Sequence, residues 1–489
     1  MKKAIIIGAG IGGIATALRL RRQGFEVVVY ESNDYPGGKL SDFVQEGYRF
    51  DAGPSLFTMP QLVTELFELY ETDASAHFAY HQKETVCNYF WMDGERFVVA
   101  ADTEQFINDA AQQFGVEATQ LRHYLQRSAQ KYELTAPIFL EQSLHRWQTY
   151  CSADTLRALV RAGQMDISSN LNAVNEARIG EPHLVQLFNR YATYNGSSPY
   201  ETPGIMSMIP HLEMHYGTFF PKGGMVQITQ SLYKFAVQQG VRFEFGQTVK
   251  RIVVERGRAR GIQTAEGLQA AEIIVSNMDI FPTYKRLLPD QIAPKRTLAQ
   301  ERSSSALIFY WGIERIFPEL DLHNILFSAD YPTEFDHIFR KKTLYDDPTV
   351  YINITAKEAP EDAPEGCENW FVMINAPGDY GQDWDHLIQA ARDHIINKIK
   401  LVLGVDIRPL IATESILDPR SIAHKTSSYR GALYGAASNS TFAAFLRHPN
   451  FSRRIDNLYF CGGSVHPGGG IPLCLQSAKI VSELVSSSK

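Results

Sequence analysis

Three glycines near the start of the chain have the spacing of a phosphate-binding turn. Gly8, Gly10 and Gly13 fit the pattern G-x-G-x-x-G. In this motif the first glycine permits a tight turn, the second lets a pyrophosphate approach the backbone, and the third lets the following helix pack closely on the preceding strand. Glu31 follows about 20 residues later, where a carboxylate can accept hydrogen bonds from a ribose. These residues predict a dinucleotide site.

The elements that must position these residues are also present. An apolar run at 4–7 has the length of a buried strand, a helical pattern follows the glycines, and Gly24 is placed to end that helix. A second apolar run at 25–30 ends beside Glu31. The stretch therefore predicts a βαβ unit whose helix N-terminus faces the phosphates. The motif does not distinguish NAD from FAD, and Glu31 argues only against a 2′-phosphate.

Two further glycine-rich loops have the composition of cofactor contacts. Pro36-Gly37-Gly38-Lys39 is either a plain surface turn or a second approach to the same cofactor, with Lys39 directed towards phosphate. Near the C-terminus, an apolar strand at 458–460 runs into Gly462-Gly463, and a helix begins after the loop 464–472. This second strand–loop–helix unit could present backbone N–H groups to the cofactor.

Composition excludes several classes of protein. With 489 residues the chain predicts two or three structural units, and its net charge of −7 argues against general nucleic-acid binding. Five scattered cysteines without C-x-x-C argue against a disulfide framework or a metal site, and indicate a reducing compartment. A run of about 18 apolar residues, which a membrane-spanning helix needs, is not found.

The remaining chain shows alternating strand and helix patterns. A hairpin is expected at 86–99 with the two-residue turn Asp93-Gly94. The pattern is helical from about 102 to 190, including helices at 137–150 and 155–165. Further strands are expected at 241–245, 247–255, 258–264, 272–276, 305–312, 350–355 and 370–375, with a helix at 383–403.

The helical region and the loop after it have two readings. Its apolar helix faces with adjacent arginines suit either the protein core or a lipid surface. The loop 191–200 and the methionine-containing stretch 205–209 suit either core filling or an elongated apolar ligand, because Met and Tyr side chains adapt to such ligands.

The chain resembles the FAD-dependent bacterial-type carotenoid (phytoene) desaturases over nearly its whole length, most weakly at about 285–420. Within that family, residues 56–60 and 189–206 are most similar to the 1-hydroxycarotenoid 3,4-desaturases. The motifs occur in the family's order: the two glycine-rich ends, Pro36-Gly37-Gly38-Lys39, Phe50-Asp51-Ala52-Gly53-Pro54-Ser55, the segment 191–199, Phe220-Pro221-Lys222-Gly223-Gly224 and His466-Pro467-Gly468-Gly469-Gly470-Ile471-Pro472.

The resemblance implies FAD in an extended pose. One departure concerns Gly463, where related flavoproteins often carry an acidic residue, so only backbone contacts are expected there. The implied cofactor contacts are Gly8, Gly10, Ile11, Gly12 and Gly13 at the pyrophosphate, Glu31 at the adenosine ribose, Gly38 and Lys39 at the phosphate and ribityl side, Gly53, Pro54 and Ser55 near the flavin, the Val249 backbone at the adenine, Gly462 and Gly463 at the ribityl–phosphate end, and Gly470, Ile471 and Pro472 at the isoalloxazine ring.

The expected fold is α/β, with a Rossmann-type FAD-binding domain of the glutathione-reductase and amine-oxidase kind. An α+β substrate domain and a helical, membrane-facing region are inserted into it. The expected boundaries are 1–75, 220–290 and 416–489 for the FAD-binding domain, 76–219 for the helical membrane-associating region, and 291–415 for the substrate domain.

The implied activity is the introduction of a C=C bond by hydride transfer from a polyene to flavin N5, specifically 3,4-desaturation of a 1-hydroxycarotenoid. Because the cofactor performs the redox chemistry, the residues identify no catalytic base. The alternatives are a phytoene desaturase acting on the hydrocarbon, a flavin amine oxidase, and a non-catalytic polyene carrier. The resemblance further implies peripheral attachment to a membrane from the cytoplasmic side, and it leaves open whether oxygen or a quinone is the final electron acceptor.

The implied substrate carries a hydroxyl in an otherwise apolar tunnel, so a polar partner is expected. Burying an unpaired hydroxyl costs about 1–3 kcal/mol. The candidate partners are Arg190, Tyr191, Tyr194 and Asn195, which can equally serve to stabilise their own loop.

Overall fold

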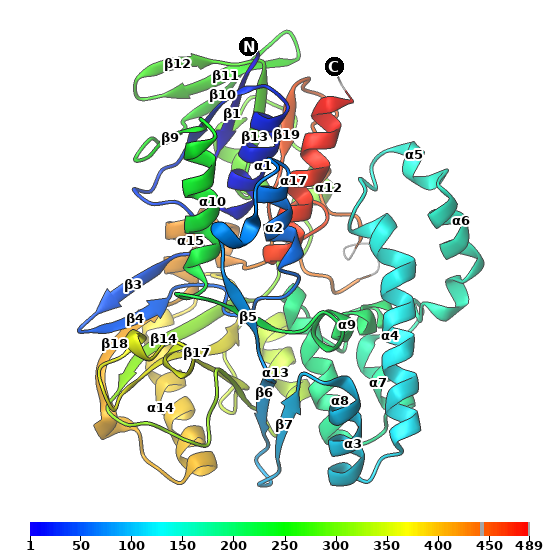
Figure 1. The fold of residues 1–489 in the computed structure, drawn as a ribbon, viewed down its shortest axis with the longest axis vertical. Coiled ribbons are helices and arrows are strands. Elements are labelled where there is room, and N and C mark those ends of the chain that lie inside the picture. The colour runs from blue at the N-terminus through cyan, green and yellow to red at the C-terminus, as the bar shows by residue number, and fades with distance from the viewer. Residues whose placement is uncertain (441–444, 488–489) are drawn as a thin grey trace.

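The N-terminal β1–α1–β2 unit forms the centre of a five-stranded parallel sheet (Figure 1). The computed structural model describes residues 1–440 and 445–487. The strands of this sheet come from both ends and the middle of the chain. In spatial order they are β19 (Leu458–Phe460), β13 (Ile273–Ser276), β1 (Lys3–Ile7), β2 (Glu26–Tyr30) and β9 (Arg242–Glu244).

Both faces of the five-stranded sheet are covered, which explains its continuous apolar strands. On one face, Ala4 and Ile6 pack with the helices, and on the other, Ile5 packs with Ile252 and Ile262 of a small antiparallel sheet. The helices are α1 (Ile11–Arg22), α10 (Val226–Gln238) and α17 (Ile471–Ser486), and the small sheet comprises β10 (Arg251–Glu255), β11 (Arg258–Thr264) and β12 (Gly267–Ala270).

A second, seven-stranded sheet forms the lower part of the molecule in Figure 1. On one face, Phe309 and Trp311 pack against Ile395 of α14 (Trp384–Leu403). On the other face, Ile308 and Tyr310 border a cavity. In spatial order the strands are β18 (Ile411–Leu417), β14 (Ser305–Ile313), β17 (Glu368–Ala376), β16 (Val350–Ile354), β15 (His323–Leu326), β6 (Thr85–Phe90) and β7 (Arg96–Ala100).

Helices between residues 103 and 214 flank the second sheet, and α5 and α6 project from them at the right of Figure 1. Within the described residues, no helix combines the length and apolarity needed to cross a membrane. These helices are α3 (Thr103–Phe114), α4 (Ala118–Phe139), α5 (Trp147–Tyr150), α6 (Ala153–Val160), α7 (Leu171–Arg178), α8 (Pro182–Asn189) and α9 (Pro210–Met214), with 3-10 turns η3 (Arg190–Asn195) and η4 (Gly204–Met208).

The expected α/β architecture is confirmed, with four local corrections. The expected helix 137–150 is broken after α4, because Thr149 and Tyr150 side chains donate to the backbone carbonyls of Ser143 and Leu144. The hairpin strands β6 and β7 are joined by a loop longer than two residues. The expected strand 247–255 begins only at β10, since Gln247 donates its N–H to the carbonyl of Glu31 instead. Strands β12, β15 and β18 were not expected.

A buried ion cluster connects the two sheets. Arg49, on β4 (Tyr48–Asp51), donates to Asp362 Oδ1 at 2.7 Å and to Asp51 Oδ1 at 3.0 Å. Asp51 Oδ2 in turn accepts from the Met225 N–H at 3.0 Å, just before α10. Asp362 lies in the loop that follows β16 of the second sheet, so one guanidinium joins this loop to β4 and, through Asp51, to the start of α10, which covers the five-stranded sheet.

Arg49→Met is expected to destabilise the protein by about 3–5 kcal/mol, because it leaves two buried carboxylates without their partner. The measurement is the melting temperature. Arg242→Met is the matched control: Arg242 pairs with Glu26 at 2.7 Å, but both side chains are about half exposed (59% and 47%). Such exposed pairs contribute about 0–1 kcal/mol. Equal, small shifts for the two variants would contradict a connecting role for Arg49.

Candidate functional site

One cavity of about 1660 Å³ lies between the carboxyl ends of the five-stranded sheet and the inner face of the seven-stranded sheet. Its volume exceeds the roughly 300–1,000 Å³ of a typical small-molecule pocket. The expected cofactor residues border it, with the exception of Gly13. They are Gly8, Gly10, Ile11, Gly12, Glu31, Gly38, Lys39, Gly53, Pro54, Ser55, Val249, Gly462, Gly463, Gly470, Ile471 and Pro472. The cavity therefore has room for a cofactor and a second ligand.

The β1–α1 turn closes one end of this cavity. Gly8 has a φ of +98°, a conformation that favours glycine. A Cβ atom at Gly13 would collide with the carbonyl oxygen of Gly8, so the helix can approach the strand this closely only with glycine at that position. Helix α1 starts after Gly10, and no side chain in the described part of the chain caps that end. Its first N–H groups can therefore bind an anion.

Glu31 connects the end of β2 to the glycine turn. Its Oε2 accepts a hydrogen bond from the Ala9 N–H at 2.7 Å, and its Oε1 accepts one from the Asn33 N–H at 2.9 Å. The side chain also borders the cavity. A carboxylate held in this way is in position for a ribose, and that contact stays a prediction.

Two loops continue the cavity wall from the glycine turn. The Gly37 N–H donates to the carbonyl of Ala9 at 2.8 Å, and a Cβ atom at Gly53 would collide with the carbonyl oxygen of Lys39. Lys39 Nζ donates to the carbonyl of Leu433 at 2.9 Å. Burial lowers the pKa of Lys39, and an anion in the cavity would favour its charged form.

The C-terminal loop returns to the same wall. A Cβ atom at Gly12 would lie 3.3 Å from Gly462 Cα, so the first and last glycine turns are in close contact. Gly470 precedes α17, a second helix N-terminus that no side chain among the described residues caps. At Gly463, where an acidic residue would be usual in related proteins, an added Cβ atom would lie 3.2 Å from Gly469 Cα.

Asn277 is a site residue that sequence reasoning missed. It follows β13, lies beside Gly8 and Gly462, and its Nδ2 is 3.5 Å from the carbonyl oxygen of Gly8. The sequence feature that could have identified Asn277 is its position directly after the expected strand 272–276. The carboxyl ends of neighbouring parallel strands share one crevice.

This arrangement fits an extended dinucleotide cofactor. Two uncapped helix N-termini and several glycine turns supply backbone donors along one wall, as phosphate groups require. Side chains on Gly12 or Gly13 would crowd or collide with the backbone of that wall. The residues present therefore suit FAD, whose pyrophosphate the β1–α1 turn would hold.

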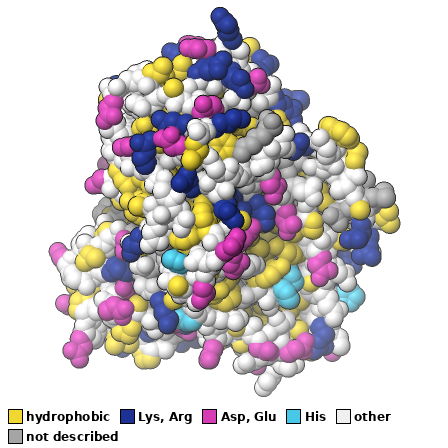
Figure 2. Space-filling model, turned by 45° about the horizontal axis from the view of Figure 1, so that its top comes forward, with side chains coloured by type: hydrophobic (Ala, Val, Ile, Leu, Met, Phe, Trp, Pro, Cys, Tyr) yellow, Lys and Arg dark blue, Asp and Glu magenta, His cyan; other side chains and the backbone are white. Residues whose placement is uncertain are grey.

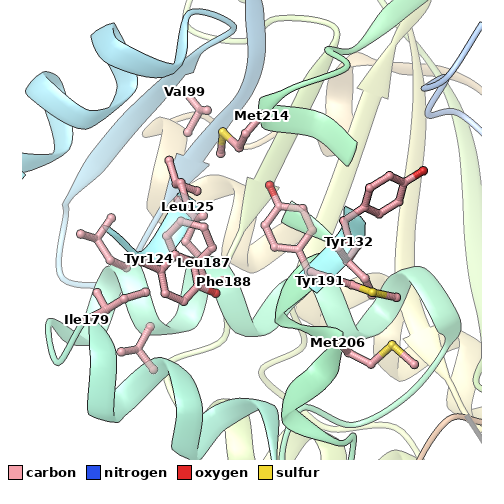
Figure 3. Close-up of a cluster of buried hydrophobic side chains, with 14 of the residues drawn as sticks. Val99, Tyr124, Leu125, Tyr132, Ile179, Leu187, Phe188, Tyr191, Met206 and Met214 are labelled. Atoms are coloured by element: carbon pink, nitrogen blue, oxygen red, sulfur yellow. The ribbon is translucent and has the colours of Figure 1, made fainter. Parts of the chain in front are cut away.

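The other part of the cavity is mainly apolar and contains three of the four expected substrate residues. Arg190, Tyr194 and Asn195 border it, whereas Tyr191 lies in the adjoining hydrophobic core together with Phe188 (Figure 3). Arg190 Nη2 and the Tyr191 hydroxyl both donate to Glu213 Oε2, at 3.1 and 2.6 Å. These side chains are already paired within the protein, and their contact with a substrate stays a prediction.

Sequence reasoning also missed that Ser55, an expected cofactor residue, forms a polar chain with Tyr351 and His323. The Ser55 Oγ and Tyr351 hydroxyl oxygens are 2.8 Å apart, and the Tyr351 hydroxyl is 2.8 Å from His323 Nδ1. All three residues border the cavity. His323 lies on β15 and Tyr351 on β16, and β15 showed no recognisable strand pattern in the sequence.

Comparisons with known proteins agree with this geometry. The model of the flavin containing amine oxidoreductases matches residues 11–486. A 1-hydroxycarotenoid 3,4-desaturase from Flavobacterium sp. (strain P99-3) is 57% identical, with 100% of each chain covered. A 4,4′-diapolycopene oxygenase from Methylomonas sp. is 31% identical, with 99% of this chain and 98% of the relative covered. A solved structure of putrescine oxidase superposes with a TM-score of 0.66 at 13% identity, covering 100% of this chain and 99% of that one, and shows a shared fold.

Gly13→Ala is expected to lower the flavin content of the purified protein strongly, because the added Cβ atom must push α1 away from Gly8. Absorbance of released flavin per mole of protein measures the effect. Gly163→Ala is the control, since a Cβ atom there has open space around it. Normal flavin content in the Gly13 variant would show that this turn does not hold the cofactor.

Proposed function

This chain belongs to the flavin containing amine oxidoreductase family, and we propose that it is an FAD-dependent carotenoid desaturase that forms the 3,4 double bond of a 1-hydroxycarotenoid. The observation that carries this proposal is the cavity of about 1660 Å³, which joins a cofactor wall of backbone donors to a mainly apolar chamber. The full-length similarity to a 1-hydroxycarotenoid 3,4-desaturase supports the choice of substrate.

The residues of the cofactor wall would bind FAD and orient it. The α1 N-terminus and the turn around Gly10 would hold the pyrophosphate, Glu31 the adenosine ribose, and the loops at Ser55 and Gly470 the flavin end. When bound, FAD supplies the acceptor for the hydride that leaves the substrate carbon. The protein chain positions that carbon and keeps water away from it. Oxygen or a quinone would complete the cycle, and reoxidation rates with each acceptor would distinguish them.

The apolar chamber suits a polyene. Met206, Met208, Ile209, Leu212 and Phe445 border it. Thioether side chains are flexible and polarizable, so they can follow a long conjugated chain closely. Such walls exclude water from the reacting carbons and leave few polar groups to bind a small amine. This composition favours the desaturase over a flavin amine oxidase, although the fold is shared with putrescine oxidase.

We further propose that the α5–α6 segment rests on a lipid surface, through which a water-insoluble substrate would enter. Trp147 is 71% exposed, Tyr150 54% and Val160 80%. Arg146 and Arg161 lie at the ends of the two helices. Hydrophobic and basic side chains gather at the right edge of the molecule in Figure 2, where this segment projects. Apolar groups beside arginines suit the acyl boundary and anionic headgroups of one leaflet.

The proposed reaction predicts that a 1-hydroxylated carotene bleaches the visible flavin absorption under anaerobic conditions. The product should contain one additional double bond, placed at the 3,4 position by chromatography and mass spectrometry. Phytoene is the control substrate. Ready conversion of phytoene would reject the 1-hydroxycarotenoid assignment in favour of a phytoene desaturase, and the absence of bleaching with any carotene would reject the desaturase.

The membrane proposal predicts that the protein floats with anionic liposomes, and that the double variant Trp147→Asp, Val160→Asp stays in the soluble fraction. The variant places charges where apolar groups would enter the lipid. The double variant Ile292→Asp, Leu401→Asp is the control, because these residues are similarly exposed (68% and 72%) outside the segment. Wild-type protein that remains soluble with and without carotenoid would contradict the proposal.

A further inference from the structure

The hydrogen bonds around His323 define which of its ring nitrogens carries the proton. Burial lowers the pKa of His323 to about 3, so the imidazole is neutral and has one N–H. Asn353 Nδ2 lies 3.0 Å from the carbonyl oxygen of Leu322 and 3.2 Å from His323 Nδ1. The contact with Leu322 identifies that atom as the amide nitrogen, which can only donate. His323 Nδ1 is therefore an acceptor, and the proton is on Nε2.

The same reasoning assigns the donor and the acceptor in each of the other hydrogen bonds that link Ser55, Tyr351 and His323. Because Nδ1 has no proton, the Tyr351 hydroxyl donates to it over 2.8 Å, and Ser55 Oγ then donates to the Tyr351 oxygen over 2.8 Å. Tyr351 keeps its proton, since burial raises the pKa of its phenol above the ordinary value. Each donor in this hydrogen-bond chain, from Ser55 to Tyr351, therefore has an acceptor. Tyr351 and Asn353 together fix the orientation of the His323 ring.

His323 Nε2 is the unsatisfied end of this chain. The residue is 3% exposed, and within the part of the chain that the structure describes, Nε2 has no hydrogen-bond partner. A buried N–H without an acceptor is costly and calls for an explanation, such as a ligand group. His323 borders the cavity, so a ligand bound there lies beside this residue. The acceptor expected is an uncharged oxygen, because a charge without a counter-charge is costly to bury in mainly apolar surroundings.

We infer that His323 is a specificity-determining residue that donates from Nε2 to the hydroxyl oxygen at the end of the substrate. This inference rests on the proposed function. In a 1-hydroxycarotenoid that is desaturated at positions 3 and 4, one carbon separates the hydroxyl-bearing carbon from the nearer reacting carbon. The hydroxyl must therefore bind close to the flavin end of the chamber. His323 satisfies this requirement, because Tyr351 connects it to Ser55, which follows the loop Gly53-Pro54 on the cofactor wall.

The competing donor Arg190 is less suitable, because most of its donor groups are already engaged. Arg190 is paired with Glu213 at 3.1 Å and lies 3.4 Å from the Tyr194 hydroxyl. Its guanidinium stacks on Tyr89, Tyr191 and Tyr194, at 4.6–5.5 Å from their ring centroids. Arg190 Nε also has no partner among the described residues, but it belongs to a charged guanidinium that is already ion-paired, whereas His323 Nε2 carries the one N–H of a neutral ring. A hydrocarbon substrate would leave that N–H without an acceptor, so the site discriminates against it.

The test compares kcat/KM for a 1-hydroxylated carotene with that for the matching hydrocarbon, both presented in the same detergent micelles. For the wild type the ratio should exceed one. His323→Phe keeps a ring of similar shape but removes the donor, and should lower the ratio by about 10- to 100-fold. His323→Gln retains an N–H near the Nε2 position and should restore part of the preference. His448→Phe is the control: His448 is equally buried, its pKa is also lowered by burial, and it does not border the cavity.

Tyr351→Phe provides a second variant that leaves His323 in place. It removes the hydroxyl that orients the imidazole, and should lower the same ratio by a smaller factor than His323→Phe. Dissociation constants for both carotenes, measured by quenching of protein fluorescence, should change in the same direction as the ratio. Agreement of the two readouts assigns the effect to binding of the hydroxyl.

Several results would overturn the inference. An unchanged ratio in His323→Phe would do so, as would an equal loss of activity on both carotenes, which indicates a structural or proton-transfer role. A wild type without preference would also exclude it. A wild type whose flavin is bleached by neither carotene would remove the proposed function together with this inference. Normal bleaching with an unchanged ratio would remove the inference alone.

Discussion

The close contact between the first turn of α1 and the end of β1 is the constraint on which the rest of the structure depends. Gly13 allows the helix to approach the carbonyl oxygen of Gly8, and this approach directs the uncapped helix N-terminus into the cavity. Strands β13 and β19 lie on one side of β1 and place Asn277 and Gly462 against the same turn. Segments more than 250 residues apart in the chain thus share one wall, which is the general geometry of ligand sites at the carboxyl ends of parallel strands.

The cavity is formed jointly by two sheets, and their relative position is therefore part of the site. Arg49 connects them through Asp51, which also accepts from the backbone ahead of α10, and through Asp362, which follows β16. A buried guanidinium between carboxylates has strict geometric requirements, so it holds the cofactor wall opposite the apolar chamber. The hydrogen-bond chain from Ser55 through Tyr351 to His323 also links the cofactor wall to the second sheet. It places polar groups in a mainly apolar chamber.

The two parts of the cavity are built from different kinds of group. The cofactor wall consists largely of backbone groups and glycines, which impose few requirements on neighbouring side chains. The chamber is built from side chains of the second sheet and the helical region, and its apolar residues can change without disturbing the wall. Similarity to putrescine oxidase extends to the fold.

The sequence by itself determined the elements that are specified by residues close to one another in the chain. The β1–α1–β2 unit, its glycines and Glu31 lie within about 30 consecutive residues, and strand, turn and helix signals of that range are read directly from residue types. The glycine loops at Lys39 and Gly462 were recognised for the same reason, whereas Gly53 was expected only from the family resemblance, and the structure brings all three to one cavity. The helix expected at 137–150 failed because side-chain hydrogen bonds of Thr149 and Tyr150 compete with the helical backbone.

Only the tertiary structure decided which distant side chains meet. His323 faces Asn353 because β15 and β16 pair in that register, and Tyr351 reaches Ser55 across 296 residues of chain. Arg190 and Tyr191 are adjacent in sequence and both donate to Glu213 Oε2, yet of these two only Arg190 borders the cavity. Three features depend on long-range packing: the strand register, the pairing of buried charges and the unpaired nitrogen of His323. Local residue patterns do not predict such packing.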